Sequence, residues 1–168
     1  MLKYLGFIII FLTSLLLGYI HFKKFSNRVN FLIRYSQFIN YIEAEILYSS
    51  DIIIDLIKKY SINDSLNNFL IYFIDKLKSG FTVKNAWKIA LNDIKDFSGL
   101  TGDDIMLIEN FGSTFGNSDI DSQVSYCKMN KKLIDSQINV ALENKEKKGK
   151  LYFTLYMLGG ISIILFFI

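Results

Sequence analysis

The sequence contains no proline, one cysteine and one histidine among 168 residues. Without proline, the residue that most often breaks a helix is missing, so long continuous helices are allowed. Cys127 alone cannot form a disulfide within one chain, and a single thiol suits a reducing compartment. One histidine and one cysteine also leave no zinc ligand set, no cysteine–histidine pair and no serine triad. We therefore expect no enzyme, no metal and no cofactor.

A basic stripe of the kind that binds nucleic acid is also missing, although the formal net charge is +3. The basic residues instead gather in two clusters, Lys23, Lys24 and Arg28, and Lys145, Lys147, Lys148 and Lys150. Each cluster adjoins a long uncharged stretch, and positive charge beside a membrane span marks the cytoplasmic side. We expect no nucleic-acid partner.

The uncharged stretches are nineteen residues from Tyr4 to Phe22 and eighteen from Leu151 to Ile168. A helix of about 17–25 apolar residues crosses a bilayer, so both are predicted transmembrane helices, with a buried core helix as the alternative for each. Bulky residues stand where a signal peptidase needs small ones, which favours an uncleaved anchor. The predicted organisation is a transmembrane helix at 1–22, a cytoplasmic helical bundle at 23–150 and a second transmembrane helix at 151–168. The protein would lie in the cell membrane with both chain ends across it.

The middle of the chain has helical periodicity and no sustained strand-like alternation. Apolar positions continue from the first span in steps of three and four, which predicts one long helix to about Ser49. Ser79-Gly80 ends a third helix and Thr82 caps a fourth, whose apolar face includes Trp87. Capping boxes at Thr101–Asp104 and Ser118–Asp121 predict two further helix starts. Gly116 would close the fifth helix in a left-handed conformation. Gly149 is the only candidate break before the second span, which gives six helices in all.

The candidate chemical motifs have plainer structural interpretations. Glu43 and Glu45 are two residues apart on a helix and so point about 200° apart, which prevents them from clamping one ligand. Asp119 and Asp121 lack the glycine and distal glutamate of a calcium loop. Phe111-Gly112 and Phe115-Gly116 repeat in four-residue steps, but no strand precedes them and no Lys-Ser or Lys-Thr follows as in a phosphate loop. Both are therefore interpreted as structural glycines at a helix end. His21 lies near the cytoplasmic edge of the first span.

Three stretches resemble the stage III sporulation protein AB family: Tyr41 to Tyr48 with Glu43 and Glu45; Gly80 with Val83, Ala86-Trp87 and Ala90-Leu91; and Leu107, Phe111-Gly112, Phe115-Gly116, Ser118-Asp119 and Gln123. The resemblance covers essentially the whole chain. It makes Glu43, Glu45, Trp87, Phe111, Gly112, Gly116, Asp119 and Gln123 the candidate partner-binding or structural residues. That family is itself similar to the cytoplasmic domain of type II secretion platform proteins, which implies an all-α, six-helix antiparallel bundle.

The resemblance also implies a function. The protein would be a scaffold of a secretion-like channel complex in the mother-cell membrane around the forespore, required for spore formation. Its partners would be a cytoplasmic sporulation ATPase and other membrane subunits, and homo-oligomerisation stays open. The alternatives are a platform of another type II secretion or type IV pilus-like system, and a pore-forming membrane protein.

Overall fold

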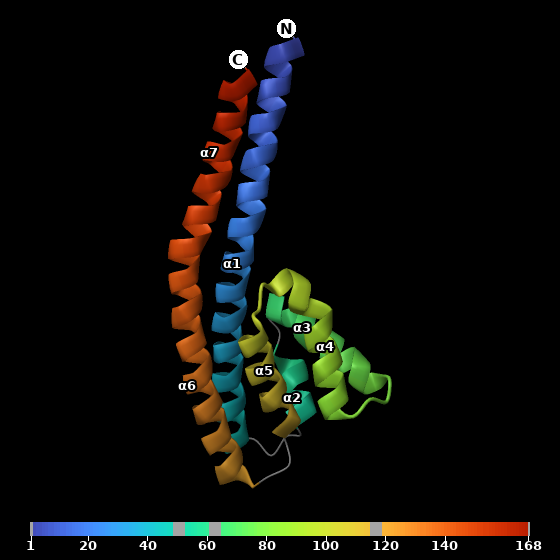
Figure 1. The fold of residues 1–168 in the computed structure, drawn as a ribbon. Helices are drawn as coiled ribbons and strands as arrows, with labels where there is room; N and C mark the ends of the chain where they lie inside the picture. Colours follow the sequence, from blue (N-terminus) through green and yellow to red (C-terminus); the bar gives the residue numbers. More distant parts are fainter. Residues whose placement is uncertain (1, 49–52, 61–64, 115–118, 168) are drawn as a thin grey trace.

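The computed structural model describes residues 2–48, 53–60, 65–114 and 119–167. Two long antiparallel rods run side by side and carry a cluster of short helices near one end (Figure 1). One rod is α1 (Leu2–Tyr48); the other consists of α6 (Ile120–Asn144), a π-helical turn η1 (Lys145–Gly149) and α7 (Lys150–Phe167). The short helices are α2 (Ile53–Lys59), α3 (Ser65–Lys78), α4 (Val83–Ser98) and α5 (Gly102–Thr114). With the second rod counted as one helix, the described residues form the six predicted helices and no strand, which confirms the all-α class.

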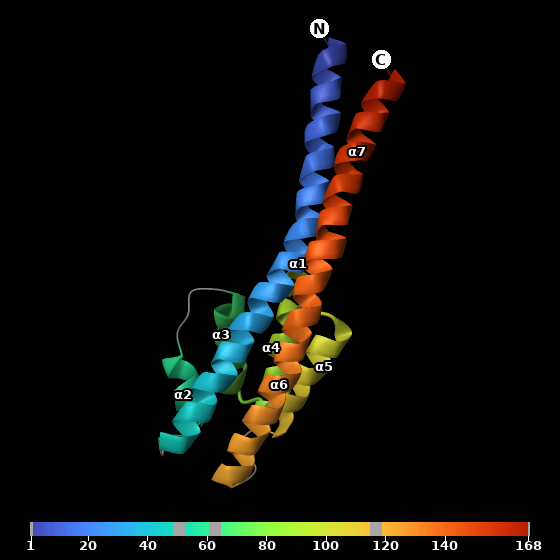
Figure 2. The ribbon, with the colours of Figure 1, turned by 90° about the vertical axis from the view of Figure 1, so that its left-hand side faces the viewer.

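The core lies where the two rods meet α3, α4 and α5, which cover one face of the pair (Figure 2). The apolar stripe predicted on the first helix is buried, and so is the stripe of α4, where Trp87 is only 1 % exposed. Aromatic rings fill the centre, with Phe69 and Phe73 edge-on to Trp87 at centroid distances of 4.8 and 5.0 Å. Such pairs add to the free energy gained by burying apolar surface.

The two rods keep one antiparallel register from the bundle to their apolar ends. Glu43 lies opposite Lys128, and Ser36 donates a hydrogen bond to Asp135 at 2.8 Å. Farther along, Gly18 packs against Phe153, and the hydroxyl of Ser14 donates to the carbonyl of Tyr156. The apolar ends, residues 4–22 of α1 and 151–167 of α7, therefore pack as an antiparallel pair of helices, the apolar hairpin, which continues directly from the bundle. Few of their residues are buried, which is compatible with a membrane span.

The π-helical turn explains how the second rod keeps this register. Buried positions on α6 recur every seven residues at Cys127, Ile134 and Ala141, which is the spacing of a coiled-coil seam. The next buried position, Gly149, comes one residue later than that repeat. A π turn accommodates one extra residue without breaking the helix. The break predicted at Gly149 is therefore a bulge, and α7 remains in contact with α1.

The helix starts agree in part with the predictions. The side chain of Thr82 accepts the N–H of Asn85 at 3.4 Å, and Gly80 ends the preceding helix at φ 88°. The Thr101–Asp104 capping box is present, with the Thr101 N–H donating to Asp104 at 2.8 Å. The predicted cap Ser118 and the predicted left-handed Gly116 lie outside the described residues. Asp119 caps α6 instead, because its extended backbone lets its carboxylate accept the N–H of Ser122 at 3.1 Å.

Tyr35 is fully buried in this core, and its hydroxyl has no hydrogen-bond partner among the described residues. Burial raises the pKa of this phenol well above its usual value. A buried polar group without a partner costs about 1–3 kcal/mol. Tyr35→Phe should therefore increase the free energy of unfolding by about 1 kcal/mol. Thermal denaturation of the full chain in detergent micelles measures this, and a decrease would show that the hydroxyl is satisfied.

Candidate functional site

The end of the rods farthest from both chain termini is the distal tip, formed by the last turns of α1 and the first turns of α6 (Figure 1). From Phe22, the last residue of the predicted span, α1 continues unbroken to Tyr48. At about 1.5 Å per residue this places the tip roughly 39 Å beyond the apolar hairpin. Four of the candidate residues lie at this tip: Glu43, Glu45, Asp119 and Gln123.

The tip has large apolar side chains in solvent. Tyr48 is 90 % exposed, Ile120 59 % and Leu47 52 %. Single exposed apolar residues are ordinary, but three large ones at the ends of two adjacent rods mark a surface suited to protein contact. Glu45 is half-buried beside them. The tip therefore combines apolar and acidic groups.

The other three candidate residues at the tip have structural contacts. The side chain of Glu43 is 19 % exposed and lies 3.9 Å from the Lys128 ammonium, across the seam between α1 and α6. Hydrogen bonds from Ser122 lower the pKa of Asp119 below its ordinary value. The backbone N–H of Gln123 donates to the Asp119 carbonyl at 3.0 Å, in the first turn of α6. The Glu43–Lys128 pair joins α1 to α6, and the two contacts of Asp119 order the first turn of α6.

The remaining described candidates, Trp87, Phe111 and Gly112, meet in the core instead. The indole N–H of Trp87 donates to the Ile108 carbonyl at 2.8 Å. Phe111 is fully buried and stacks on Tyr126 of α6 at a centroid distance of 5.8 Å. A Cβ atom at Gly112 would overlap the indole ring, so only glycine lets α5 approach α4 this closely. This set determines how the helices pack and is not available to a partner.

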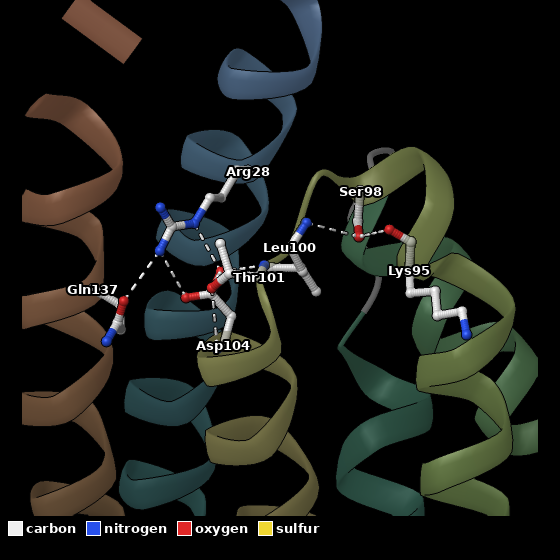
Figure 3. A network of polar contacts seen from close by, with 7 residues as sticks. All are labelled: Arg28, Lys95, Ser98, Leu100, Thr101, Asp104 and Gln137. Atoms are coloured by element: carbon white, nitrogen blue, oxygen red, sulfur yellow. Dashed lines mark hydrogen bonds and ion pairs between the residues drawn. The ribbon is translucent and has the colours of Figure 1, made fainter. Parts of the chain in front are cut away.

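A buried polar network joins α1, α5 and α6 (Figure 3). The Arg28 guanidinium donates to both oxygens of Asp104, at 2.7 and 3.0 Å, and to the side-chain oxygen of Gln137 at 3.0 Å. Asp104 also accepts the N–H and hydroxyl of Thr101, both at 2.8 Å. The capping box predicted the Thr101 contact, but nothing in the sequence indicated the partner on α1. Arg28 was assigned to a membrane-flanking cluster and is in fact 5 % exposed, so it adds no free charge there.

The corner between α4 and α5 is held against α1 beside this network. The hydroxyl of Ser98 accepts the Leu100 N–H at 3.4 Å (Figure 3). Asn27 donates its side-chain N–H to the Phe97 carbonyl at 2.9 Å. Gly99 has φ 73°, and a Cβ there would overlap the Lys24 carbonyl. The corner therefore sits close to the turn of α1 that follows the predicted span.

The described residues contain no group of three or more histidine, cysteine, aspartate and glutamate side chains placed to hold a metal ion. Burial, with a smaller contribution from Glu43, raises the pKa of the Cys127 thiol to about 11. This thiol is protonated and enclosed near neutral pH, whereas the thiolate is the reactive form. The contacts of the candidate residues suit a structural role, in which packing and charge pairs hold the helices in fixed positions.

The fold is thus an all-α bundle carried on an apolar helical hairpin. The family model for stage III sporulation protein AB matches residues 3–168, and the chain belongs to that family. A solved structure, "Stage III sporulation protein AB (SpoIIIAB)", is similar with a TM-score of 0.62 and 21 % identity, over 72 % of this chain and 98 % of that one. At that identity the likeness supports the fold alone. No curated protein matches the chain.

Proposed function

We propose that the chain is the membrane platform of a secretion-like channel complex between mother cell and forespore, and that its distal tip docks a cytoplasmic ATPase. The observation that carries the proposal is the distal tip. It presents exposed apolar side chains, with the half-buried Glu45 beside them, roughly 39 Å from the apolar hairpin and at the end of an unbroken helix. Membership of a stage III sporulation family supplies the sporulation context.

The rods suit a platform because they join the tip to the hairpin without a flexible linker. A continuous pair of packed helices transmits displacement along its axis, whereas a flexible linker would absorb it. The seam is reinforced by Ser36–Asp135 and by the Arg28–Asp104–Gln137 network. A motor that binds the tip would therefore act on the membrane segment.

The proposed orientation places the bundle in the cytoplasm and both chain ends across the membrane. Lys23 and Lys24 on α1, and Lys147, Lys148 and Lys150 on the second rod, are exposed around the base of the apolar hairpin. Even without the buried Arg28, these lysines outnumber the single lysine at the opposite end of the first span, Lys3. Positive charge flanking a span is retained in the cytoplasm.

Tyr48→Ser should weaken binding of the ATPase to the full chain in nanodiscs by about tenfold or more, because an exposed aromatic at an interface commonly contributes over 1 kcal/mol. Tyr72→Ser is the matched control: it removes the same side chain, 40 % exposed, from α3 at the side of the bundle. Binding is measured by surface plasmon resonance with the purified cytoplasmic sporulation ATPase. Spore yield should fall with Tyr48→Ser alone. Equal affinities for the two variants would contradict docking at the tip.

A further inference from the structure

We propose that the corner between α4 and α5, Phe97 to Leu100, rests in the headgroup layer of the membrane, with the Phe97 ring in contact with anionic lipid. The inference rests on the proposed membrane hairpin. It adds a second attachment to the bilayer, made by the bundle itself. The partner is the lipid surface on the cytoplasmic side.

The depth follows from the contacts between the corner and α1. The Phe97 carbonyl accepts a hydrogen bond from Asn27 at 2.9 Å, and Gly99 packs on the Lys24 carbonyl. At about 1.5 Å per residue, Lys24 lies roughly 3 Å and Asn27 roughly 7.5 Å beyond Phe22. The headgroup and interfacial layer is about 5–8 Å thick on each side of the hydrocarbon core. The corner is therefore level with the headgroups.

The chemistry of the corner suits that layer. Phe97 is 50 % exposed, although it lies in the last turn of a helix whose other large apolar residues are mostly buried. Aromatic rings are favourable where hydrocarbon meets water. The exposed lysines at the base of the hairpin, including Lys24, on whose backbone Gly99 packs, attract anionic headgroups to the same level. A soluble protein that binds the Phe97 ring would have to displace this lipid.

The corner is rigid, so the contact would fix the height of the bundle. Gly99 is in the left-handed conformation and has no room for a side chain. Leu100 leads directly into the Thr101–Asp104 box, which the buried Arg28 holds against α1. With one attachment through the hairpin and another through Phe97, the bundle cannot swing about the membrane boundary. The distal tip is then presented at a constant distance and orientation.

The test uses the full chain in vesicles of phosphatidylethanolamine and phosphatidylglycerol, with Cys127→Ala so that a single introduced cysteine carries an environment-sensitive fluorophore. Phe97→Cys and its exposed neighbour Lys95→Cys report on the corner. Phe81→Cys is the matched control, because Phe81 is 45 % exposed at the other end of α4. Ile20→Cys reports on the predicted span. Lipids with a nitroxide on the headgroup, or within the acyl chain, serve as quenchers.

We expect the headgroup nitroxide to remove most of the emission at positions 97 and 95 and little at 81, while the acyl-chain nitroxide quenches position 20. If 97 and 95 behave like 81 while 20 is quenched, the hairpin stands and the corner contact is overturned. If position 20 is also unquenched by either lipid, the membrane hairpin of the proposed function fails, and the inference fails with it.

Discussion

Asp104→Asn should lower the free energy of unfolding by about 3–5 kcal/mol, the cost of removing one partner from a buried ion pair. Asp104 is fully buried and accepts hydrogen bonds from Arg28 and Thr101. Asparagine keeps the size but removes the charge, and its amide group points N–H donors at a guanidinium that has only donors. The Arg28 charge is then left in the core without a counter-charge. Thermal and urea denaturation of the full chain in detergent micelles, followed by circular dichroism, measures the loss.

Glu109→Gln is the matched control, on the same helix. Glu109 pairs with Lys88 at 2.9 Å, but the two side chains are 31 % and 56 % exposed. Exposed pairs contribute about 0–1 kcal/mol, so this variant should be nearly as stable as the wild type. Adding Arg28→Met to Asp104→Asn should cost less than the two single changes together, because the second change removes the stranded charge. Similar stability of the Asp104 and Glu109 variants would show that the network does not hold the bundle.

Gly112→Ala should be destabilising by about 3 kcal/mol or more, although it adds only a methyl group. The added carbon would overlap the Cγ, Cδ1 and Nε1 atoms of Trp87. The indole is held in place, since Phe69 and Phe73 pack edge-on to it and its N–H donates to the Ile108 carbonyl. Either α5 moves away from α4 or the indole loses its hydrogen bond. Loss of the near-ultraviolet circular dichroism of Trp87, together with a lower melting temperature, is the expected result.

Gly102→Ala separates this clash from any general intolerance of alanine in α5. Gly102 is the first residue of α5, and a Cβ there would have no atom within 4 Å. Replacing glycine by alanine at such a position commonly stabilises a helix by about 0.4–1 kcal/mol. Wild-type stability in the Gly112→Ala variant would mean that α4 and α5 are farther apart than the structure has them.

Both changes should also affect partner binding, although neither residue lies at the distal tip. The Arg28–Asp104 network joins α5 to both rods, and the Trp87–Gly112 contact joins α5 to α4. A loosened bundle presents the tip in many orientations, which reduces the fraction competent to bind. Weaker binding in these variants therefore follows from the bundle, whereas Tyr48→Ser should weaken binding with the melting temperature unchanged.

The sequence by itself determined the features that depend on neighbouring residues. Helical periodicity and the lack of proline predicted the helices, because side chains three and four residues apart share a face whatever the rest of the chain does. The stripe through Leu32 and Tyr35, the cap at Thr82 and the end at Gly80 are all local in this sense. Two long apolar runs were likewise sufficient to predict the two apolar terminal helices, although not their contact with each other.

Only the tertiary structure decided which distant residues meet. Arg28 and Asp104 are 76 positions apart, and the charge pattern placed Arg28 with the membrane-flanking lysines. Gly112 resembled a helix-ending glycine, but its role is to admit the Trp87 ring from another helix. The π turn before Gly149 keeps the second rod in phase with α1, a requirement that exists only once both rods are packed. Pairings of this kind depend on the register between helices, which is set by how side-chain volumes fit in three dimensions and leaves no periodic trace along the chain.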